Sequence, residues 1–276
     1  MVSVAYQPFP MVGRARGQVW RYAPQYRRPR HFHAELEVNL VTAGTGTVGV
    51  GELIFGVLPG DLLSWPPGVD HELLEASADF ELYVMGATPE FSARVLGSAE
   101  GRAYGGPVQL RLNAAQVAEL RQRCAVPPGE GGGTVAAETA IGDLWHDLQA
   151  SRAADGAANS ITRRVVCSLK AKPDLGRDRL ARLVRTHPSE LSRHFHRGVG
   201  LTLAAYRTRV RLARFIETVD RGGDLLSSAL SAGFGSYSQC HRSFWSVLGC
   251  APSRFFDRQT RREMEEAFVT LDESFR

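Results

Sequence analysis

A tandem repeat near the end of the chain constrains its fold more than any other feature. At an offset of 49 residues, the same or a similar side chain recurs at four pairs of positions: Arg193 and Arg242, Phe195 and Phe244, Gly200 and Gly249, and Tyr206 and Phe255. Each copy is typical of a short helix, a turn and a second helix that ends at glycine, the residue best suited to the left-handed conformation. The repeat therefore predicts two helix-turn-helix units.

Apolar residues in both copies predict which side chains are buried. In the first copy, four residues are expected to form the apolar face of the first helix: Leu180, Ala181, Leu183 and Val184. The second helix, over 189–197, is expected to bury Leu191 and Phe195. In the second copy, the residues expected in the core are Leu226, Ala229, Leu230, Cys240, Phe244 and Val247.

The second helix of each copy then presents polar side chains outward. In the first copy these are Ser189, Ser192, Arg193 and His196, and in the second they are Tyr237, Ser238, His241 and Arg242. A helix in the major groove of DNA can place arginine against guanine, and hydroxyl or imidazole groups against other base edges. Two such helices in one chain could enter successive major grooves about 34 Å apart.

A long helix over 201–221 is predicted between the copies and sets the distance between them. It carries three arginines on one face, which we expect to contact the DNA backbone: Arg207, Arg211 and Arg214. Net charge supports this expectation, because residues 160–262 carry +13 whereas residues 1–159 carry −5 and residues 263–276 carry −4. Clustered basic residues neutralise phosphates, so the basic region favours nucleic acid as a partner. An arginine-rich helical bundle would share the charge but would not explain why arginine recurs on both second helices.

The amino-terminal part has a different pattern. From Arg30 to about Gly86, alternating apolar residues and regularly spaced Gly and Pro predict an antiparallel β-barrel or sandwich. A helical tract follows over 113–123, and the Pro/Gly-rich stretch 127–133 predicts a flexible connection. An apolar stripe after it either packs on the barrel or serves as a dimerisation helix: Ile141, Leu144, Trp145 and Leu148.

These patterns together predict an α+β multidomain chain. We divide it into a barrel with trailing helices over 1–126, a linker with a dimerisation helix over 127–159, a double helix-turn-helix domain over 160–262, and an acidic tail over 263–276. No apolar run or amino-terminal leader predicts insertion into a membrane, and the four cysteines lack paired CxxC spacing. We therefore expect a cytoplasmic protein without structural zinc.

A polar strand in the barrel region predicts a binding site. Residues His31, His33, Glu35 and Glu37 alternate, and are therefore expected on one face of a single strand. Downstream, Gly60-x5-Pro66-x-Gly68-x2-His71 adds a turn and another histidine. Aromatic residues outside this pattern are expected either in the core or near the pocket: Trp20, Tyr22, Tyr26 and Trp65.

Both regions resemble known families. Residues 160–262 resemble the DNA-binding domain of AraC/XylS-family regulators, through LARLVRTHPSELSRHFHRGVGLTLAAYRTRVRLA and ALSAGFGSYSQCHRSFWSVLGCAPSRFF. Residues 30–86 resemble the cupin barrel and the AraC-type effector-binding barrel, through His-x-His-x3-Glu-x6-Gly and the second histidine motif. Three residues depart from the family patterns: Ser228 replaces a buried aliphatic residue, Phe256 a frequent Arg, and Glu75 the last Asn.

The resemblance implies a transcription regulator, an activator or a repressor, that binds double-stranded promoter DNA. It implies base contacts from Ser189, Ser192 and Arg193 in the first unit, and from Tyr237, Ser238, His241 and Arg242 in the second. It also implies a homodimer, and RNA polymerase would be a further partner. The cupin metal-ligand positions correspond to His31, His33, Glu37 and His71.

Several alternatives remain for these four residues. They could hydrogen-bond a small organic effector, bind a divalent transition metal alone or with an effector, or form an inert part of the scaffold. A metal-dependent cupin enzyme fused to a DNA-binding module is the alternative from another functional class. A nonspecific architectural DNA-binding protein is a third class. The effector-sensing, non-enzymatic regulator is the function that we predict.

Overall fold

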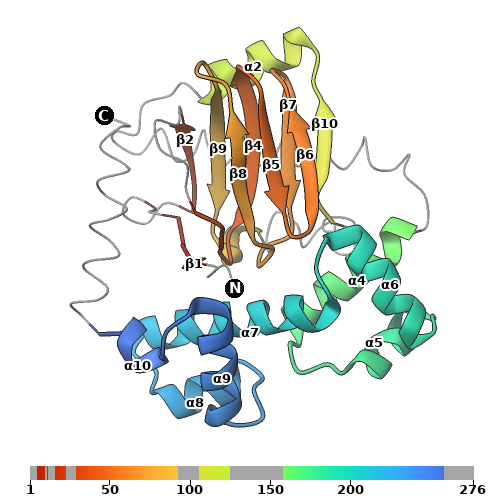
Figure 1. Ribbon diagram of the computed structural model, residues 1–276, viewed down its shortest axis with the longest axis vertical. Coiled ribbons are helices and arrows are strands. Elements are labelled where there is room, and N and C mark those ends of the chain that lie inside the picture. The colour runs from red at the N-terminus through yellow and green to blue at the C-terminus, as the bar shows by residue number, and fades with distance from the viewer. Residues whose placement is uncertain are drawn as a thin grey trace.

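The computed structural model describes residues 5–9, 11, 16–22, 29–92, 106–124 and 158–257. In Figure 1 the strands lie in the upper part and the helices of residues 158–257 lie below them. Three predicted features lie outside the described residues: the linker with its apolar stripe over 134–148, Tyr26, and the acidic tail over 263–276.

Two five-stranded sheets form the upper part. The first has the order β1 (Ala5–Tyr6), β3 (His31–Phe32), β8 (His71–Ala76), β5 (Gly46–Val50) and β6 (Leu53–Val57). The second has the order β10 (Val108–Arg111), β7 (Asp61–Trp65), β4 (Leu36–Ala43), β9 (Glu81–Ala87) and β2 (Gly17–Tyr22). All of these pairings are antiparallel except that of β1 with β3. The expected antiparallel architecture is confirmed, with one parallel pair added at an edge.

The central strand β4 is buried on both faces along nearly its whole length, although it carries polar residues among its apolar ones. Glu37, Asn39 and Val41 alternate on the face that lines an internal cavity. The intervening side chains, such as Leu40, pack in the hydrophobic core that also contains Leu120. Leu120 belongs to α2 (Ala114–Cys124), which confirms the helical tract predicted after the barrel.

The carboxyl-terminal part is entirely helical among its described residues. Its helices are α4 (Ala158–Ala171), α5 (Arg177–Val184), α6 (Pro188–Val199), α7 (Leu203–Asp220), α8 (Leu225–Ser231), α9 (Tyr237–Leu248) and α10 (Pro252–Phe255). Helices α6 and α9 begin and end at the offset of 49 residues. Gly200 and Gly249 both have φ of 73° after these helices, so the predicted glycine ends are confirmed.

Three apolar residues that we expected in the core are exposed instead. The exposed fractions are 47% for Leu183, 56% for Leu226 and 50% for Leu230. In α8, which has seven residues, Ser228 and Ala229 are the buried positions. Their small side chains permit close packing at these positions, and the two leucines lie at the edge of the buried face.

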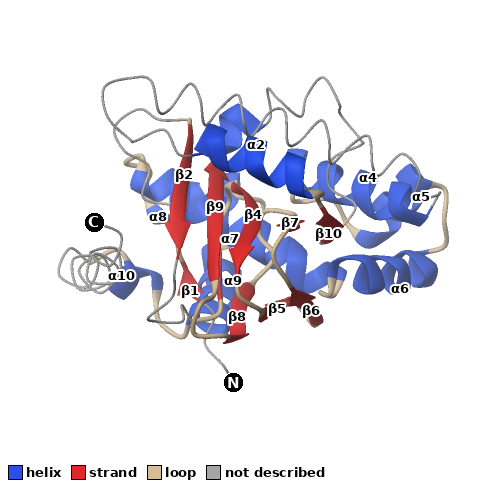
Figure 2. Ribbon diagram, turned by 90° about the horizontal axis from the view of Figure 1, so that it is seen from above, coloured by secondary structure: helices blue, strands red, loops and turns tan. Residues whose placement is uncertain are grey.

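The barrel lies against α7, and Figures 1 and 2 both show this helix beneath the strands. The Tyr206 hydroxyl donates to the carbonyl oxygen of Pro67 at 3.0 Å, and the two residues are separated by 139 positions. Tyr6 and Phe32 from the barrel join the hydrophobic core of the second helix-turn-helix unit. The two parts of the chain therefore share a packed interface.

Among the described residues, no helix is long and apolar enough to cross a bilayer. Within the part of the chain that the structure describes, Cys167, Cys240 and Cys250 are not part of a disulfide bond. Burial raises the pKa of the Cys240 thiol to about 12, so this residue behaves as an apolar core side chain.

Ser228→Ala should stabilise the protein. Ser228 is 1% exposed, and its hydroxyl has no hydrogen-bond partner within the described structure. A buried unpaired polar group costs about 1–3 kcal/mol, and alanine removes it with little loss of volume. Urea unfolding should show a higher midpoint with an unchanged slope, and a lower midpoint would contradict this account.

Glu217→Gln should stabilise the protein in a pH-dependent way. Burial, and then the negative charge of Glu35, raise the pKa of Glu217 from 4.5 to about 7. The folded state therefore retains a proton that the unfolded chain loses near pH 4.5. Protonation of Glu217 favours the folded state, and this contribution to stability is lost as the pH rises through about 7.

Thermal unfolding of Glu217→Gln and wild type should be compared at pH 5 and pH 8. The melting temperature of the variant should exceed that of wild type by a larger margin at pH 8 than at pH 5. Each 1 kcal/mol of destabilisation that the substitution removes should raise it by about 2–4 °C. Glu75→Gln is the matched control, because Glu75 is exposed. An equal difference at both pH values would show that the charge on Glu217 is not responsible.

Candidate functional site

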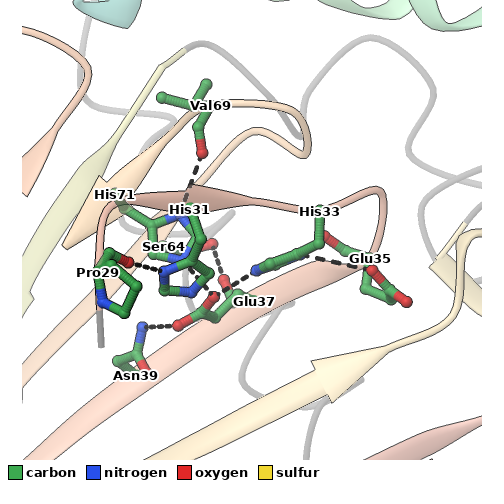
Figure 3. Close-up of polar contacts among 9 residues, drawn as sticks. All are labelled: Pro29, His31, His33, Glu35, Glu37, Asn39, Ser64, Val69 and His71. Atoms are coloured by element: carbon green, nitrogen blue, oxygen red, sulfur yellow. Dashed lines mark hydrogen bonds and ion pairs between the residues drawn. The ribbon is translucent and has the colours of Figure 1, made fainter. Parts of the chain in front are cut away.

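The four predicted site residues converge from both sheets of the barrel (Figure 3). His31 and His71 face each other on paired strands β3 and β8, and their rings lie 4.2 Å apart between centroids. His33 follows β3, and Glu37 lies on β4. All four side chains are buried, with exposed fractions of 3–7%. The fold thus brings together the four residues that their spacing in the sequence led us to expect at one site.

The prediction of one continuous strand over 31–37 is wrong. Strand β3 ends at Phe32 in the first sheet and β4 begins at Leu36 in the second, so residues 33–35 carry the chain from one sheet to the other. This crossing allows His31 and Glu37 to approach the same centre from different sheets. The Glu35 carboxylate lies 3.6 Å from His33 Nδ1, the ring nitrogen that does not face Glu37, and its charge also interacts with Glu217 of α7.

Backbone hydrogen bonds fix the orientation of the three imidazoles. Each Nδ1 atom lies within hydrogen-bond distance of a carbonyl oxygen two residues away: His31 with Pro29 at 2.8 Å, His33 with Glu35 at 3.2 Å, and His71 with Val69 at 3.1 Å. Because a carbonyl oxygen only accepts, Nδ1 carries the proton that it donates in each ring. This leaves Nε2 as the second ring nitrogen, without a backbone partner. One ring nitrogen from each histidine lies within 4.8 Å of the other two.

Glu37 is the polar centre of the cluster. Its Oε2 atom lies 2.8 Å from His33 Nε2, and its Oε1 atom accepts from Asn39 Nδ2 at 2.8 Å. Ser64 Oγ donates to the backbone carbonyl of Glu37 at 2.8 Å. His71 Nε2 lies 3.1 Å from Glu37 Oε2 but is not aligned for a hydrogen bond, so this buried nitrogen is left without one.

Charge within the cluster follows from these contacts. Burial opposes ionisation of Glu37, yet the adjacent His71 and the hydrogen bond from His33 hold the pKa of this carboxyl well below its usual value. Burial also opposes a charge on His33, but the hydrogen bond to Glu37 raises the pKa of its imidazole. Burial, followed by repulsion from His71 and His33, lowers the pKa of His31. The contacts thus favour charge on Glu37 and His33 and disfavour it on His31.

A cavity of about 70 Å³ lies beside the cluster. Its polar lining comes from five residues: His31, Glu37, Asn39, His71 and Glu72. Its remaining lining is mostly apolar and aromatic: Tyr22, Val41, Val48, Leu63, Trp65, Leu73, Leu82 and Val84. The polar cluster is therefore one side of a pocket whose other side is apolar.

Some residues near the site were not among those predicted, and others lie away from it. Asn39 was missed, although its position two residues after Glu37 on a strand was the signal that could have found it. Tyr22 and Trp65 line the cavity, whereas Trp20 stacks on Phe9 with centroids 4.9 Å apart. Glu75, at the last position of the second motif, is exposed on β8.

The predicted base-reading residues lie on α6 and α9. Ser189 and Arg193 are exposed on α6, and Ser238 and Arg242 are exposed on α9. The other three are partly buried, and each makes a contact within its own helix. Ser192 Oγ donates to the Pro188 carbonyl at 3.1 Å, and the rings of Tyr237 and His241 lie 6.2 Å apart in an edge-to-face arrangement.

Two of the three arginines expected at the DNA backbone bind carbonyl oxygens within the protein. Arg207 Nη1 donates to Leu175 O at 3.1 Å, and Arg211 Nε donates to Pro173 O at 2.8 Å. Arg214 lies on the same helix and is partly buried. Arg207 and Arg211 thus connect α7 to the loop before α5, and contact with phosphate remains a prediction for all three.

Comparison with protein families matches both parts of the chain. An AraC-like ligand binding domain matches residues 17–126, and a helix-turn-helix domain matches residues 180–258. No curated protein matches the chain. The barrel is therefore a ligand-binding domain and the helical part a DNA-binding domain, the combination that defines a transcription regulator. The chain belongs to the AraC family of these regulators.

Several solved structures align with the chain at low similarity. ToxT from Vibrio cholerae, bound to (E)-4-(8-methylnaphthalen-1-yl)but-3-enoic acid, is 13% identical with a TM-score of 0.47, over 87% of this chain and 97% of that one. The AraC-like transcriptional activator CuxR is 17% identical with a TM-score of 0.31, over 73% and 72%. An oxalate decarboxylase from Bacillus subtilis is 26% identical with a TM-score of 0.23, over 28% and 22%. With TM-scores below 0.5, these likenesses carry no argument about function.

Proposed function

We propose that the histidine cluster binds a divalent transition metal, and that a small effector binds beside it to control the attachment of the regulator to promoter DNA. The observation that carries the proposal is the orientation of three imidazoles by backbone carbonyls around Glu37. Such outer hydrogen bonds are the usual means of orienting metal-binding histidines. Three imidazoles and one carboxylate suit a divalent transition metal.

The residues present fit such an ion. His31, His33, Glu37 and His71 would hold it, and Asn39 would orient the carboxylate through its hydrogen bond to Oε1. His71 Nε2 is buried without a hydrogen bond, as expected of an atom whose partner is a ligand. A metal at this position would supply a Lewis-acid centre for a donor atom of the effector.

The cavity indicates the kind of effector. Apolar side chains from β4, β5, β7, β8 and β9 form most of the remaining lining, including Val41, Val48, Leu63, Leu73 and Leu82. A small molecule with an apolar body and one polar group would bury the body there and direct the polar group to the cluster. A molecule that is polar throughout would leave its groups unpaired against this wall.

The DNA-binding part of the proposal rests on two helices of equal length. Exposed polar side chains and arginine recur at equivalent positions of α6 and α9, with Arg193 and Arg242 as equivalents. We propose that these arginines contact base edges. A homodimer, contact with RNA polymerase, a cytoplasmic location and the absence of enzymatic turnover stay predictions from the sequence.

Metal binding can be measured on the intact protein. Calorimetric titration of metal-free wild type with Co²⁺ should show one ion per chain. Loss of a ligand in His71→Ala should weaken binding by more than about 100-fold, and Asn39→Ala, which removes an outer hydrogen bond, by about 10-fold.

Glu75→Ala is the matched control for these variants, because Glu75 lies on β8 with His71 but is exposed. This variant should bind Co²⁺ as wild type does. Absence of stoichiometric binding to wild type would contradict the metal and favour direct hydrogen bonding of an effector.

Base reading can be tested by selecting preferred DNA sequences from a random pool. Arg193→Ala and Arg242→Ala should each relax discrimination at different base pairs, by about 1–3 kcal/mol per lost bidentate contact. Arg214→Ala should weaken binding to all sequences alike and reduce the salt slope by about 1, if it meets a phosphate. Uniform losses in all three variants would contradict the assignment of the two base-reading arginines.

A further inference from the structure

Residues of the cluster alternate with residues that contact the DNA-binding domain. Phe32 lies between His31 and His33 and is fully buried. Consecutive residues of an extended chain point in opposite directions, so Phe32 faces away from the cluster. Its ring packs edge-to-face on Tyr6 with centroids 5.4 Å apart, and the Arg209 guanidinium of α7 lies 5.8 Å from its centroid. Both aromatic residues belong to the core of the second helix-turn-helix unit.

The segment 67–71, which ends at the third histidine, makes a second contact with α7. Pro67 O accepts from the Tyr206 hydroxyl at 3.0 Å. Gly68 lies so close to the helix that a Cβ atom there would be 3.6 Å from Val210 Cγ2. The Gly68 amide also donates to His33 O at 2.8 Å, which connects the segment directly to residues 31–33.

Asp70, adjacent to His71, provides the charge in this interface. Its carboxylate forms ion pairs with Arg30 of the barrel and with Arg209 of α7, and it is 2% exposed. Arg209 is itself mostly buried, with 12% of its side chain exposed. A buried carboxylate that loses one of its partners becomes costly, so this contact depends strongly on the position of Asp70.

The barrel also contacts the first helix-turn-helix unit. At the turn between β5 and β6, the Glu52 amide donates to Gly200 O at 2.7 Å, and the Glu52 carboxylate lies 3.2 Å from His196 Nε2 of α6. Residues on both sides of α7 are therefore held by the same barrel. A small shift of the barrel against α7 changes its contacts with both units.

We propose that segments 31–33 and 67–71 form a coupling element, through which occupancy of the cluster strengthens the contact of the barrel with α7 and fixes the arrangement of the two base-reading helices. The proposal rests on the proposed function in that the cluster binds a ligand. An ion bound to His31, His33 and His71 would restrain both segments, and thereby lower the entropic cost of holding Phe32 and Asp70 against the helix.

Thermodynamic coupling between two sites is reciprocal. If a bound ion strengthens the contact of the barrel with α7, this contact must in turn strengthen binding of the ion. Arg209→Gln should weaken binding of Co²⁺ by about 5-fold or more, although Arg209 is not a ligand. Arg221→Gln is the matched control: Arg221 also pairs with the barrel, to Glu90 at 3.0 Å, but both side chains are exposed. This control should bind Co²⁺ within about 2-fold of wild type.

Arg209→Lys distinguishes the loss of the charge contact from a general folding defect. The shorter cation retains the charge beside Asp70, so this variant should recover part of the affinity that Arg209→Gln loses. Equal Co²⁺ affinity in wild type and Arg209→Gln, or tighter binding by Arg209→Gln, would overturn the proposal.

Amide hydrogen exchange gives a second readout and separates this proposal from the metal site itself. Co²⁺ should slow exchange over 203–210 in wild type but not in Arg209→Gln. If wild type binds no Co²⁺, the metal proposal fails, and the coupling between the cluster and α7 is then tested by hydrogen exchange in the metal-free protein. There His31→Ala should speed exchange over 203–210, whereas Val41→Ala, which truncates a cavity-lining residue outside the two segments, should not. Equal effects of these two substitutions would overturn the coupling.

Discussion

The passage of the chain from one sheet to the other between His33 and Glu35 determines most of the molecule described above. It brings histidines from the first sheet against Glu37 from the second, and so creates a buried polar cluster that neither sheet could form alone. Phe32, directly before the break, points away from the cluster, and its ring enters the core of the second helix-turn-helix unit. A strand that continued without the break would keep Glu37 in the same sheet as His31, and the two residues could not approach one centre from different sheets.

Much of the helical domain could be predicted from the sequence, because its determinants are local. Glycine after a helix, proline at its start and apolar residues at spacings of three and four predicted the bounds of α6 within two residues, and the offset of 49 residues predicted an equivalent helix where α9 lies. Burial at the edge of a short helix could not be predicted in this way. Leu226 and Leu230 have the periodicity of core residues, but the buried surface of α8 is too narrow to include them.

The site residues of the barrel could be predicted from their spacing, whereas their supporting contacts could not. His31, His33, Glu37 and His71 follow a pattern that survives the break in the strand. By contrast, the carbonyl partners of the imidazoles and the interface with α7 depend on segments that pack together only in the folded chain, such as Pro67 and Tyr206. Net charge alone also does not identify the arginines that contact DNA, because Arg207, Arg209 and Arg211 of the basic domain bind partners within the protein.

The tandem arrangement of the two units has a consequence for the geometry of the target DNA. Palindromic operators mirror the two-fold symmetry of dimers. Here α6 and α9 follow one another in a single chain, and the barrel contacts them differently: the Glu52 turn meets the end of α6, whereas Tyr6 and Phe32 enter the core around α9. If both helices read base edges as we propose, the two ends of one chain differ along the DNA axis, and its first and second half-sites are distinguishable. A site read by one chain has a direction, and inverting that site would reverse the orientation of the barrel relative to the start of transcription.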